Sequence, residues 1–451
     1  MSILTPPGLS GSRLAFIAPR RTRLTKGLGG GLLGAGTISG ISGGVPLTFV
    51  AAIPIEAPCY AVRLGFGNPY NVVMTVSKAA VVPSDSYSNF PTMLATQTGQ
   101  FTIGPTGGAA SSPVYFDNAG ADVSTVNTAG TVRSFTLNGD STNTGNASKA
   151  YTLQWSDFVP CVSIPRADGG KGNILFVAIS ISTASMAKGA GICCSGASVG
   201  QAFGGTTTAN RGRPIYGAAA WVGGTDFADN ITGTGYKVTT VFPPLVCLQY
   251  LTGNPGIQVV TTGDSLSIAP TNDQYSAPLF RAGCDLSTSS TPVEFAPMAW
   301  GGAASPVYEP LLRNNMAALM PSAVAYQPLS RNDGATTAIL NRLFAQALAD
   351  AATSQAQYGT KFILNMAGCE PSFDGNATAQ AAFLDSRSRH LALAAQGVPV
   401  IDGVSVLGNV AGAAPWDYVS SSYSDDNTHP NYTGAELVVP LAKAALRRVI
   451  G

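Results

Sequence analysis

Residues 257–267 read IQVVTTGDSLS, an apolar, β-prone run that is followed at once by Gly-Asp-Ser. The run predicts a buried strand, because short apolar stretches bounded by turn residues are typical of parallel sheets. The sequence after it could open a helix, so Ser265 lies at a predicted strand-to-helix turn. A serine in this context is most often a turn or helix-capping residue, and as a nucleophile it would need a histidine to remove its proton.

The pattern of strand followed by helix continues to the end of the chain. Predicted strands lie at 257–262, 293–300, 322–329, 361–366 and 398–402, and predicted helices lie near 307–319, 334–353, 376–395 and 433–449. Five short apolar strands separated by helices predict a parallel five-stranded sheet with helices on both faces, an α/β three-layer sandwich. Ligands of such sheets gather at the carboxyl ends of the strands, so the rim near Ser265 is the predicted site.

The first half of the chain has a different texture, with little helical periodicity. Short β-prone segments such as TVRSFTLNG (131–139) and NILFVAISIS (173–182) alternate with loops rich in Gly, Asn and Ser. This alternation predicts an all-β antiparallel sandwich of jelly-roll type. We therefore expect a flexible N-terminal arm at 1–50, a β-sandwich accessory domain at 51–252 and the α/β domain at 253–451.

Charge and composition exclude some classes of partner. The 25 Lys and Arg nearly cancel the 24 Asp and Glu, and a net charge of +1 gives no field for gathering nucleic acid or anionic lipid. Only 11% of the residues are charged, while Gly and Pro number 52 and 30. This composition favours a secreted or virion-associated protein over a cytoplasmic one. The N-terminus shows no clear signal peptide, since its basic cluster follows the apolar run, and the glycine-rich stretch at 27–44 is unsuited to span a membrane.

Cysteine and histidine usage argues against a metal site. The seven cysteines are scattered without a CxxC pair, and only two histidines are present, so a zinc site has no ligand framework. We expect buried free thiols, with one or two disulfides in the first half as the alternative.

The two histidines differ in context. His390 lies in a predicted helix among charged residues, and we expect it to face solvent. His429 lies in a loop before the last helix, three residues after Asp426. A loop Asp-x-x-His can fold so that the carboxylate accepts the ring Nδ1–H, which leaves Nε2 free to accept a proton. His429 is therefore the one suitable base for Ser265, and Asp425 is the alternative acid.

Four ordered blocks carry a resemblance to a known family. GDSLS (263–267) and DNTHP (426–430) resemble the first and last blocks of the GDSL, or SGNH, hydrolases. MAWGGAAS (298–305) is similar to the family's glycine block and places its glycine at Gly302, with Gly301 as the alternative. PLSRNDG (328–334) resembles the Gly-x-Asn-Asp block and points to Asn332, although Ser330 stands where the family usually has Gly.

The resemblance implies a flavodoxin-like α/β domain that hydrolyses esters without a metal or organic cofactor. Ser265 would be the nucleophile, His429 the base and Asp426 the residue that orients the imidazole. The backbone N–H groups of Ser265 and Gly302 and the amide of Asn332 would form the oxyanion hole. Asp264 is expected to be a structural residue of the turn. In some two-domain members a β-sandwich precedes the hydrolase domain, and the first half of this chain is similar to it.

The expected substrate is a small or polymeric ester, first of all an O-acetylated carbohydrate. Short-chain lipase or thioesterase activity is the enzymatic alternative. A catalytically silent structural or carbohydrate-binding protein, such as a phage tail component, is the alternative from another class. We expect no nucleic-acid partner and no membrane span.

Overall fold

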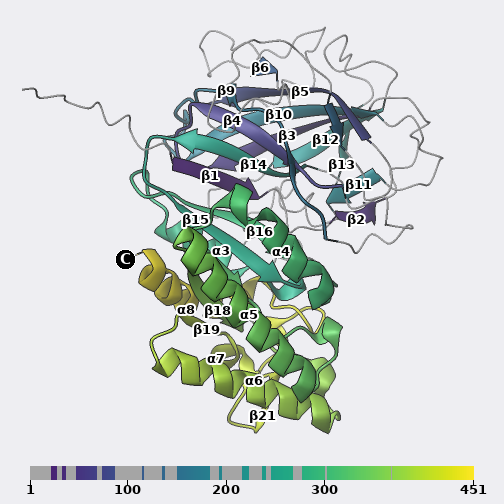
Figure 1. Cartoon of the computed structure of the whole chain (residues 1–451), viewed down its shortest axis with the longest axis vertical. Coiled ribbons are helices and arrows are strands. Elements are labelled where there is room, and N and C mark those ends of the chain that lie inside the picture. The colour runs from purple at the N-terminus through teal and green to yellow at the C-terminus, as the bar shows by residue number, and fades with distance from the viewer. Residues whose placement is uncertain are drawn as a thin grey trace, which may run out of the picture.

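The computed structural model describes most of the α/β part and the strands of the first half. The described residues are 22–27, 33–36, 47–68, 74–86, 114–115, 135–137, 150–182, 192–195, 216–222, 236–239, 245–267, 277–299, 302–366 and 368–450. Antiparallel sheets occupy the first half, and one parallel sheet with its helices occupies the second, below them in the view of Figure 1.

The second half contains the five-stranded parallel sheet that the sequence predicts. Its strands are β15 (Ile257–Gly263), β16 (Val293–Ala299), β17 (Ala323–Tyr326), β18 (Lys361–Met366) and β19 (Val400–Asp402). They lie in the order β16-β15-β17-β18-β19, and every pairing is parallel. The order reverses at β15, and the crevice at the carboxyl end of such a strand is where open α/β sheets bind ligands.

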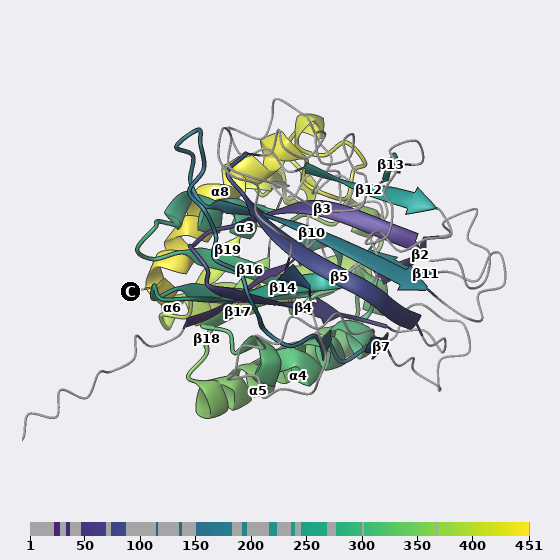
Figure 2. The ribbon, with the colours of Figure 1, turned by 90° about the horizontal axis from the view of Figure 1, so that it is seen from above.

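Helices cover both faces of this sheet, as Figure 2 shows. On one side lie α4 (Ser305–Leu319), α5 (Thr337–Tyr358) and α6 (Ala377–Ala395); on the other lie α3 (Pro278–Leu286) and α8 (Tyr432–Ile450). Successive residues of β15 serve opposite faces, since Val260 packs in the core beneath α4 and α5, whereas Val259 packs in the core beneath α3 and α8. Both faces are therefore buried, which explains the continuous apolar strands.

Short elements complete the second half. They are the 3-10 helices η2 (Ser265–Ser267), η4 (Arg331–Asp333), η5 (Pro371–Phe373) and η6 (Ser421–Tyr423), the helix α7 (Val404–Leu407), and the two-stranded sheet of β20 (Gly408–Asn409) and β21 (Ala414–Tyr418). Helix α3 was not predicted from the sequence. It is short and contains Gly283, where an added Cβ would lie 2.0 Å from the Phe295 ring, so the glycine permits close packing on β16.

Two antiparallel sheets make up most of the described first half. One contains β1 (Thr22–Gly27), β14 (Leu245–Thr252), β4 (Ala61–Phe66), β8 (Gln154–Trp155) and β9 (Val159–Pro160). The other contains β13 (Tyr236–Thr239), β12 (Tyr216–Val222), β3 (Leu47–Ile55), β10 (Asn173–Ser182), β5 (Met74–Ser84), β6 (Val114–Tyr115) and β7 (Phe135–Leu137). A small pair joins β2 (Leu33–Gly36) to β11 (Ile192–Ser195). Residues of β4 and β14 share a core with residues of β3, β5 and β10, so the two sheets pack together. The jelly-roll connectivity stays a prediction.

The expectation of a flexible arm at 1–50 is wrong for the described residues of that range. Residues 22–27 form β1, which pairs with β14 over its whole length, and residues 33–36 and 47–50 also lie in strands. Leu24 is fully buried. The partner strand of β1 is far away in the sequence, so no local pattern signals the pairing.

Buried polar contacts join the two halves near the amino ends of β15 and β16. The Glu294 carboxylate of β16 accepts the backbone N–H of Glu56 at 2.7 Å and the Tyr250 hydroxyl at 2.8 Å. Farther along, Asn315 of α4 accepts the backbone N–H of Leu153 at 2.7 Å. These contacts lie away from the carboxyl end of β15, where Ser265 begins its turn.

Two further features bear on the sequence expectations. Within the part of the chain that the structure describes, no helix combines the length and apolar character that a membrane crossing requires. The cysteines with described side chains are buried free thiols, namely Cys59, Cys161, Cys247, Cys284 and Cys369.

Candidate active site

Ser265 begins the short helix η2 directly beyond the carboxyl end of β15, and it is partly exposed. Gly263 makes the turn with a φ of +141°, a conformation that side chains rarely adopt. Asp264 then closes the turn, because its carboxylate accepts the N–H of Leu266 at 2.9 Å and its carbonyl accepts the N–H of Ser267 at 3.1 Å. The Gly-Asp-Ser sequence thus presents the Ser265 hydroxyl at the rim of the sheet.

The histidine expected beside Ser265 lies in contact with it, and the expected aspartate lies in contact with the histidine. The Nε2 atom of His429 lies 2.8 Å from Ser265 Oγ, and its Nδ1 atom lies 2.5 Å from Asp426 Oδ2. The second carboxylate oxygen of Asp426 accepts the backbone N–H groups of Thr428 at 2.9 Å and His429 at 2.8 Å. One carboxylate therefore orients both the ring and its loop.

The charge of Asp426 fixes how the imidazole is protonated. Partial burial alone would raise the pKa of this carboxyl, but the hydrogen bonds from His429 and Thr428 and the nearby imidazole lower it to about 2. Asp426 is thus ionised and can only accept, so Nδ1 of His429 carries the proton. The Nε2 lone pair is then left to accept the Ser265 hydroxyl.

The loop that carries His429 is built by several local bonds. Ser424 pairs with Pro430 as an isolated β-bridge, and the buried Tyr418 hydroxyl donates to the Thr428 carbonyl at 3.0 Å. Asp425 accepts the side-chain amide of Asn431 at 2.7 Å. The structure thus places Asp426, and not Asp425, against the imidazole.

The two residues expected to complete the oxyanion hole lie in neighbouring loops. Gly302 has a φ of +74° two residues before the cap of α4, and Gly301 lies outside the described residues. Asn332 is exposed in η4, after β17. Its Nδ2 atom donates to Asp264 Oδ2 at 3.3 Å and to the carbonyl of Ala303 at 3.2 Å. The amide therefore lies between the turn of Ser265 and the loop of Gly302.

Gln327 was not predicted from the sequence, and it bonds to Asp264 and Ser267 on either side of Ser265. It is 7% exposed, its Nε2 donates to Asp264 Oδ1 at 2.8 Å, and its Oε1 accepts the Ser267 hydroxyl at 2.6 Å. The expected structural role of Asp264 fits these bonds. A glutamine near the end of an otherwise apolar predicted strand was the signal that could have identified it.

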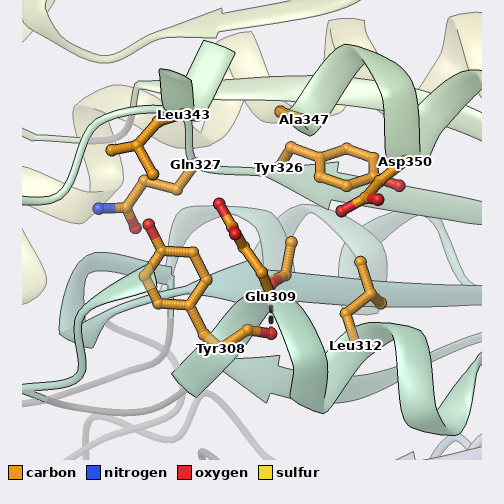
Figure 3. A pocket seen from close by; sticks show the side chains of 9 residues that line it. Tyr308, Glu309, Leu312, Tyr326, Gln327, Leu343, Ala347 and Asp350 are labelled. Atoms are coloured by element: carbon orange, nitrogen blue, oxygen red, sulfur yellow. Dashed lines mark hydrogen bonds between the residues drawn. The ribbon is translucent and has the colours of Figure 1, made fainter. Parts of the chain in front are cut away.

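Gln327 also separates the rim from a small cavity between α4 and α5. Figure 3 shows the side chains that line it, among them Tyr308, Glu309 and Asp350. Burial raises the pKa of both Tyr308 and Glu309. Ser265 and His429 do not line this cavity, so it lies behind the rim. Among the described residues, no group of three or more His, Cys, Asp or Glu is placed to hold a metal ion.

The expectation that His390 faces solvent is wrong. Its side chain is fully buried in α6, its Nδ1 lies 2.7 Å from the carbonyl of Ser386, and its ring meets the Phe344 ring edge to face at 5.1 Å. The reason is visible in the spacing, because Ala379, Ala382, Phe383, Ser386 and His390 form the buried stripe of the helix.

Burial of His390 predicts a loss of stability in mild acid. Burial lowers the pKa of this imidazole, so the folded state binds its proton less readily than the unfolded state does. Neutral His390 makes its full contribution to the free energy of unfolding above the unfolded-state pKa of about 6.5. Below that pH the contribution falls as the pH decreases, by at most about 1.4 kcal/mol per pH unit. The melting temperature should therefore fall between pH 7 and pH 5 more steeply than that of His390→Asn, which cannot titrate. Parallel slopes would contradict this.

Comparisons with known proteins show similarity to solved structures alone. No protein-family model and no curated protein sequence matches the chain. TesA is similar at 18% identity and a TM-score of 0.34, over 43% of this chain and 99% of that one. A member of the lipolytic protein G-D-S-L family from Veillonella parvula is similar at 15% identity and a TM-score of 0.33, over 43% and 99%. An acetyl-xylooligosaccharide esterase from Geobacillus is similar at 12% identity and a TM-score of 0.31, over 44% and 95%.

Proposed function

We propose that the protein is a serine ester hydrolase. The observation that carries the proposal is the continuous contact from Ser265 Oγ to His429 Nε2 at 2.8 Å and from His429 Nδ1 to Asp426 Oδ2 at 2.5 Å. A serine hydroxyl becomes an effective nucleophile when an adjacent base removes its proton and a third group orients that base. These three residue types in this order meet that requirement.

The reaction would proceed in two halves. Ser265 Oγ attacks the ester carbonyl while His429 Nε2 takes its proton, and the imidazolium then gives that proton to the leaving alcohol. A water molecule next attacks the acyl-serine ester, again losing a proton to Nε2. That proton returns to Ser265 Oγ as the carboxylic acid departs. Asp426 stays ionised throughout and stabilises the imidazolium.

The oxyanion of each tetrahedral intermediate would be bound beside the turn of Ser265. The proposed donors are the backbone N–H groups of Ser265 and Gly302 and the Nδ2–H of Asn332. The hydrogen of Asn332 that points to the Ala303 carbonyl in the structure would point to the oxyanion instead. Donors of this kind stabilise an oxyanion best when little reorientation is needed, and here the Asn332 amide would exchange one acceptor, the Ala303 carbonyl, for the oxyanion.

For the substrate we propose a short acyl ester on a neutral carbohydrate, with acetate as the first choice. The low charged fraction of 11% and the net charge of +1 fit an uncharged substrate. Antiparallel β-sheets joined to the α/β half fit an enzyme of polymeric glycans, and the secreted or virion-associated location stays part of this proposal. Acetate release from a panel of acetylated glycans, compared with p-nitrophenol release from p-nitrophenyl esters of two- to eight-carbon acids, would separate this substrate from short-chain lipids.

Covalent labelling tests the proposed nucleophile. A fluorophosphonate should add one adduct per chain, detected by intact mass, and peptide mapping should place it on Ser265. Ser265→Ala should remain unlabelled, whereas Ser405→Ala, which removes an exposed hydroxyl in α7, should label as the natural protein does. Unchanged labelling of Ser265→Ala would show that another residue reacts and would overturn the assignment of Ser265. No labelling of the natural protein together with no ester hydrolysis would favour a catalytically silent structural or carbohydrate-binding protein.

A further inference from the structure

Ser330 differs from the residue that the resembled family usually has at this position, and its hydroxyl is engaged. The residue is fully buried. Its Oγ donates to Asp264 Oδ2 at 2.7 Å, and Ser330 Oγ also accepts the backbone N–H of Asn332 at 3.2 Å. Ser330 does not belong to the described non-glycine residues with a positive φ. The backbone here therefore has no need of glycine, and a glycine could make neither hydroxyl bond.

Asp264 collects bonds from both sides of the proposed site. The residue is 1% exposed, and its carboxylate accepts the N–H of Leu266 at 2.9 Å, on the turn that presents Ser265. It also accepts from Gln327 at 2.8 Å, Ser330 at 2.7 Å and Asn332 at 3.3 Å, on the segment after β17. A buried carboxylate is stable only when hydrogen bonds replace its hydration. Asp264 thus joins the nucleophile turn to the loop of the oxyanion donor.

The placement of the Asn332 amide depends on this junction. Asn332 is exposed, and its contact with Asp264, at 3.3 Å, is longer than that of Ser330. Ser330 fixes the carboxylate oxygen that Asn332 contacts and also holds the backbone of Asn332. Loss of the Ser330 hydroxyl would remove one bond to Asp264 Oδ2 and one to the Asn332 backbone, so the amide would be held less firmly in place to bind the oxyanion.

We infer that Ser330 is a positioning residue that orients Asn332 through Asp264 and through the Asn332 backbone. The inference rests on the proposed function, since it assigns Ser330 a part in stabilising the oxyanion of that reaction. Ser330 touches neither the substrate nor the reacting atoms, and its effect is transmitted by the Asn332 amide.

A double-mutant cycle between Ser330 and Asn332 tests the inference. Asn332→Ala should lower kcat by about 10²- to 10³-fold, which is typical for the loss of one oxyanion donor. Ser330→Ala should lower kcat by about tenfold with KM nearly unchanged, because a misplaced donor stabilises the transition state less well but hardly affects binding of the ester. In the Asn332→Ala background, Ser330→Ala should have no further effect.

Two controls make the cycle decisive. Ser386→Ala removes another fully buried hydroxyl, one with no hydrogen-bond partner among the described residues, and should leave kcat unchanged. Ser330→Gly replaces Ser330→Ala if that variant fails to fold, as checked by its melting temperature. An equal loss from Ser330→Ala in both backgrounds would overturn the inference and leave the proposed function standing. Full activity of Ser265→Ala would overturn both.

Discussion

Replacing either Ser265 or His429 with alanine is expected to lower kcat on a short acyl ester by about 10⁶-fold, and replacing both together is expected to lower it no further. Neither residue accomplishes the attack without the other, because the hydroxyl needs the Nε2 lone pair that lies 2.8 Å away. The rate that remains would come from the binding site and the oxyanion donors, which these substitutions leave in place. Initial rates on p-nitrophenyl acetate at saturating ester measure the effect.

His390→Asn is the matched control for the histidine. It alters the other of the two histidines in the chain, which is fully buried in α6 and makes no hydrogen bond to Ser265 or Asp426. Its kcat should stay within about twofold of the natural value. If the fold-decrease in kcat of the Ser265→Ala, His429→Ala double variant equalled the product of the two single fold-decreases, the two residues would not act as one unit. The proposed mechanism would then be wrong.

The strands of the α/β half could be predicted from the sequence because the signal is local. Four of the predicted ranges match β15, β16, β18 and β19 to within two residues at each end. The exception is the third, where the predicted strand at 322–329 ends at Tyr326. Gln327 leaves the sheet to contact Asp264; its polar side chain interrupts the apolar run, but the sequence does not show which residue it contacts. Helix α3 was missed because it is short and contains a glycine.

The first half shows where local patterns fail. Short β-prone segments between loops rich in Gly, Asn and Ser predict strands, and the described part of the first half contains strands. Strand pairing, however, is decided by residues far apart in the sequence. Thr22 pairs with Thr252 at one end of β1 and Gly27 pairs with Cys247 at the other. The sequence around residues 22–27 does not indicate which strand they pair with, so the segment is predicted as part of an arm.

In the candidate site, too, some residues can be predicted from the sequence and some contacts cannot. Ser265, Asp426 and His429 could be proposed from the sequence because each lies in a short block with a chemical reason for its spacing. The structure adds what spacing cannot give, namely that Gln327 and Ser330 bond to Asp264 and that both hydrogens of the Asn332 amide meet protein acceptors. Those contacts depend on side-chain rotamers within one folded rim.

Replacing Asp426 with asparagine is expected to lower kcat by about 10⁴-fold while leaving the fold intact. Asp426 Oδ1 accepts two backbone N–H groups, from Thr428 and His429. An asparagine would keep its carbonyl oxygen there and turn its NH₂ group toward Nδ1. Nδ1 of His429 would then have to accept, so its proton would move to Nε2, which could no longer take the proton of Ser265.

The pH profile and a neighbouring variant distinguish this cause from a general loss of structure. The pKa of Asp426 is held near 2, so its carboxylate is ionised from about pH 4 upward and kcat of Asp426→Asn should stay below that of the natural protein at every pH from 5 to 9. Asp425→Asn should retain kcat within about twofold, because Asp425 accepts the amide of Asn431 and an asparagine oxygen can replace it. Equal losses in Asp425→Asn and Asp426→Asn would mean that loop structure, rather than the imidazole tautomer, limits the rate. A loss confined to Asp426→Asn, with an unchanged melting temperature, would locate the effect at Nδ1 of His429.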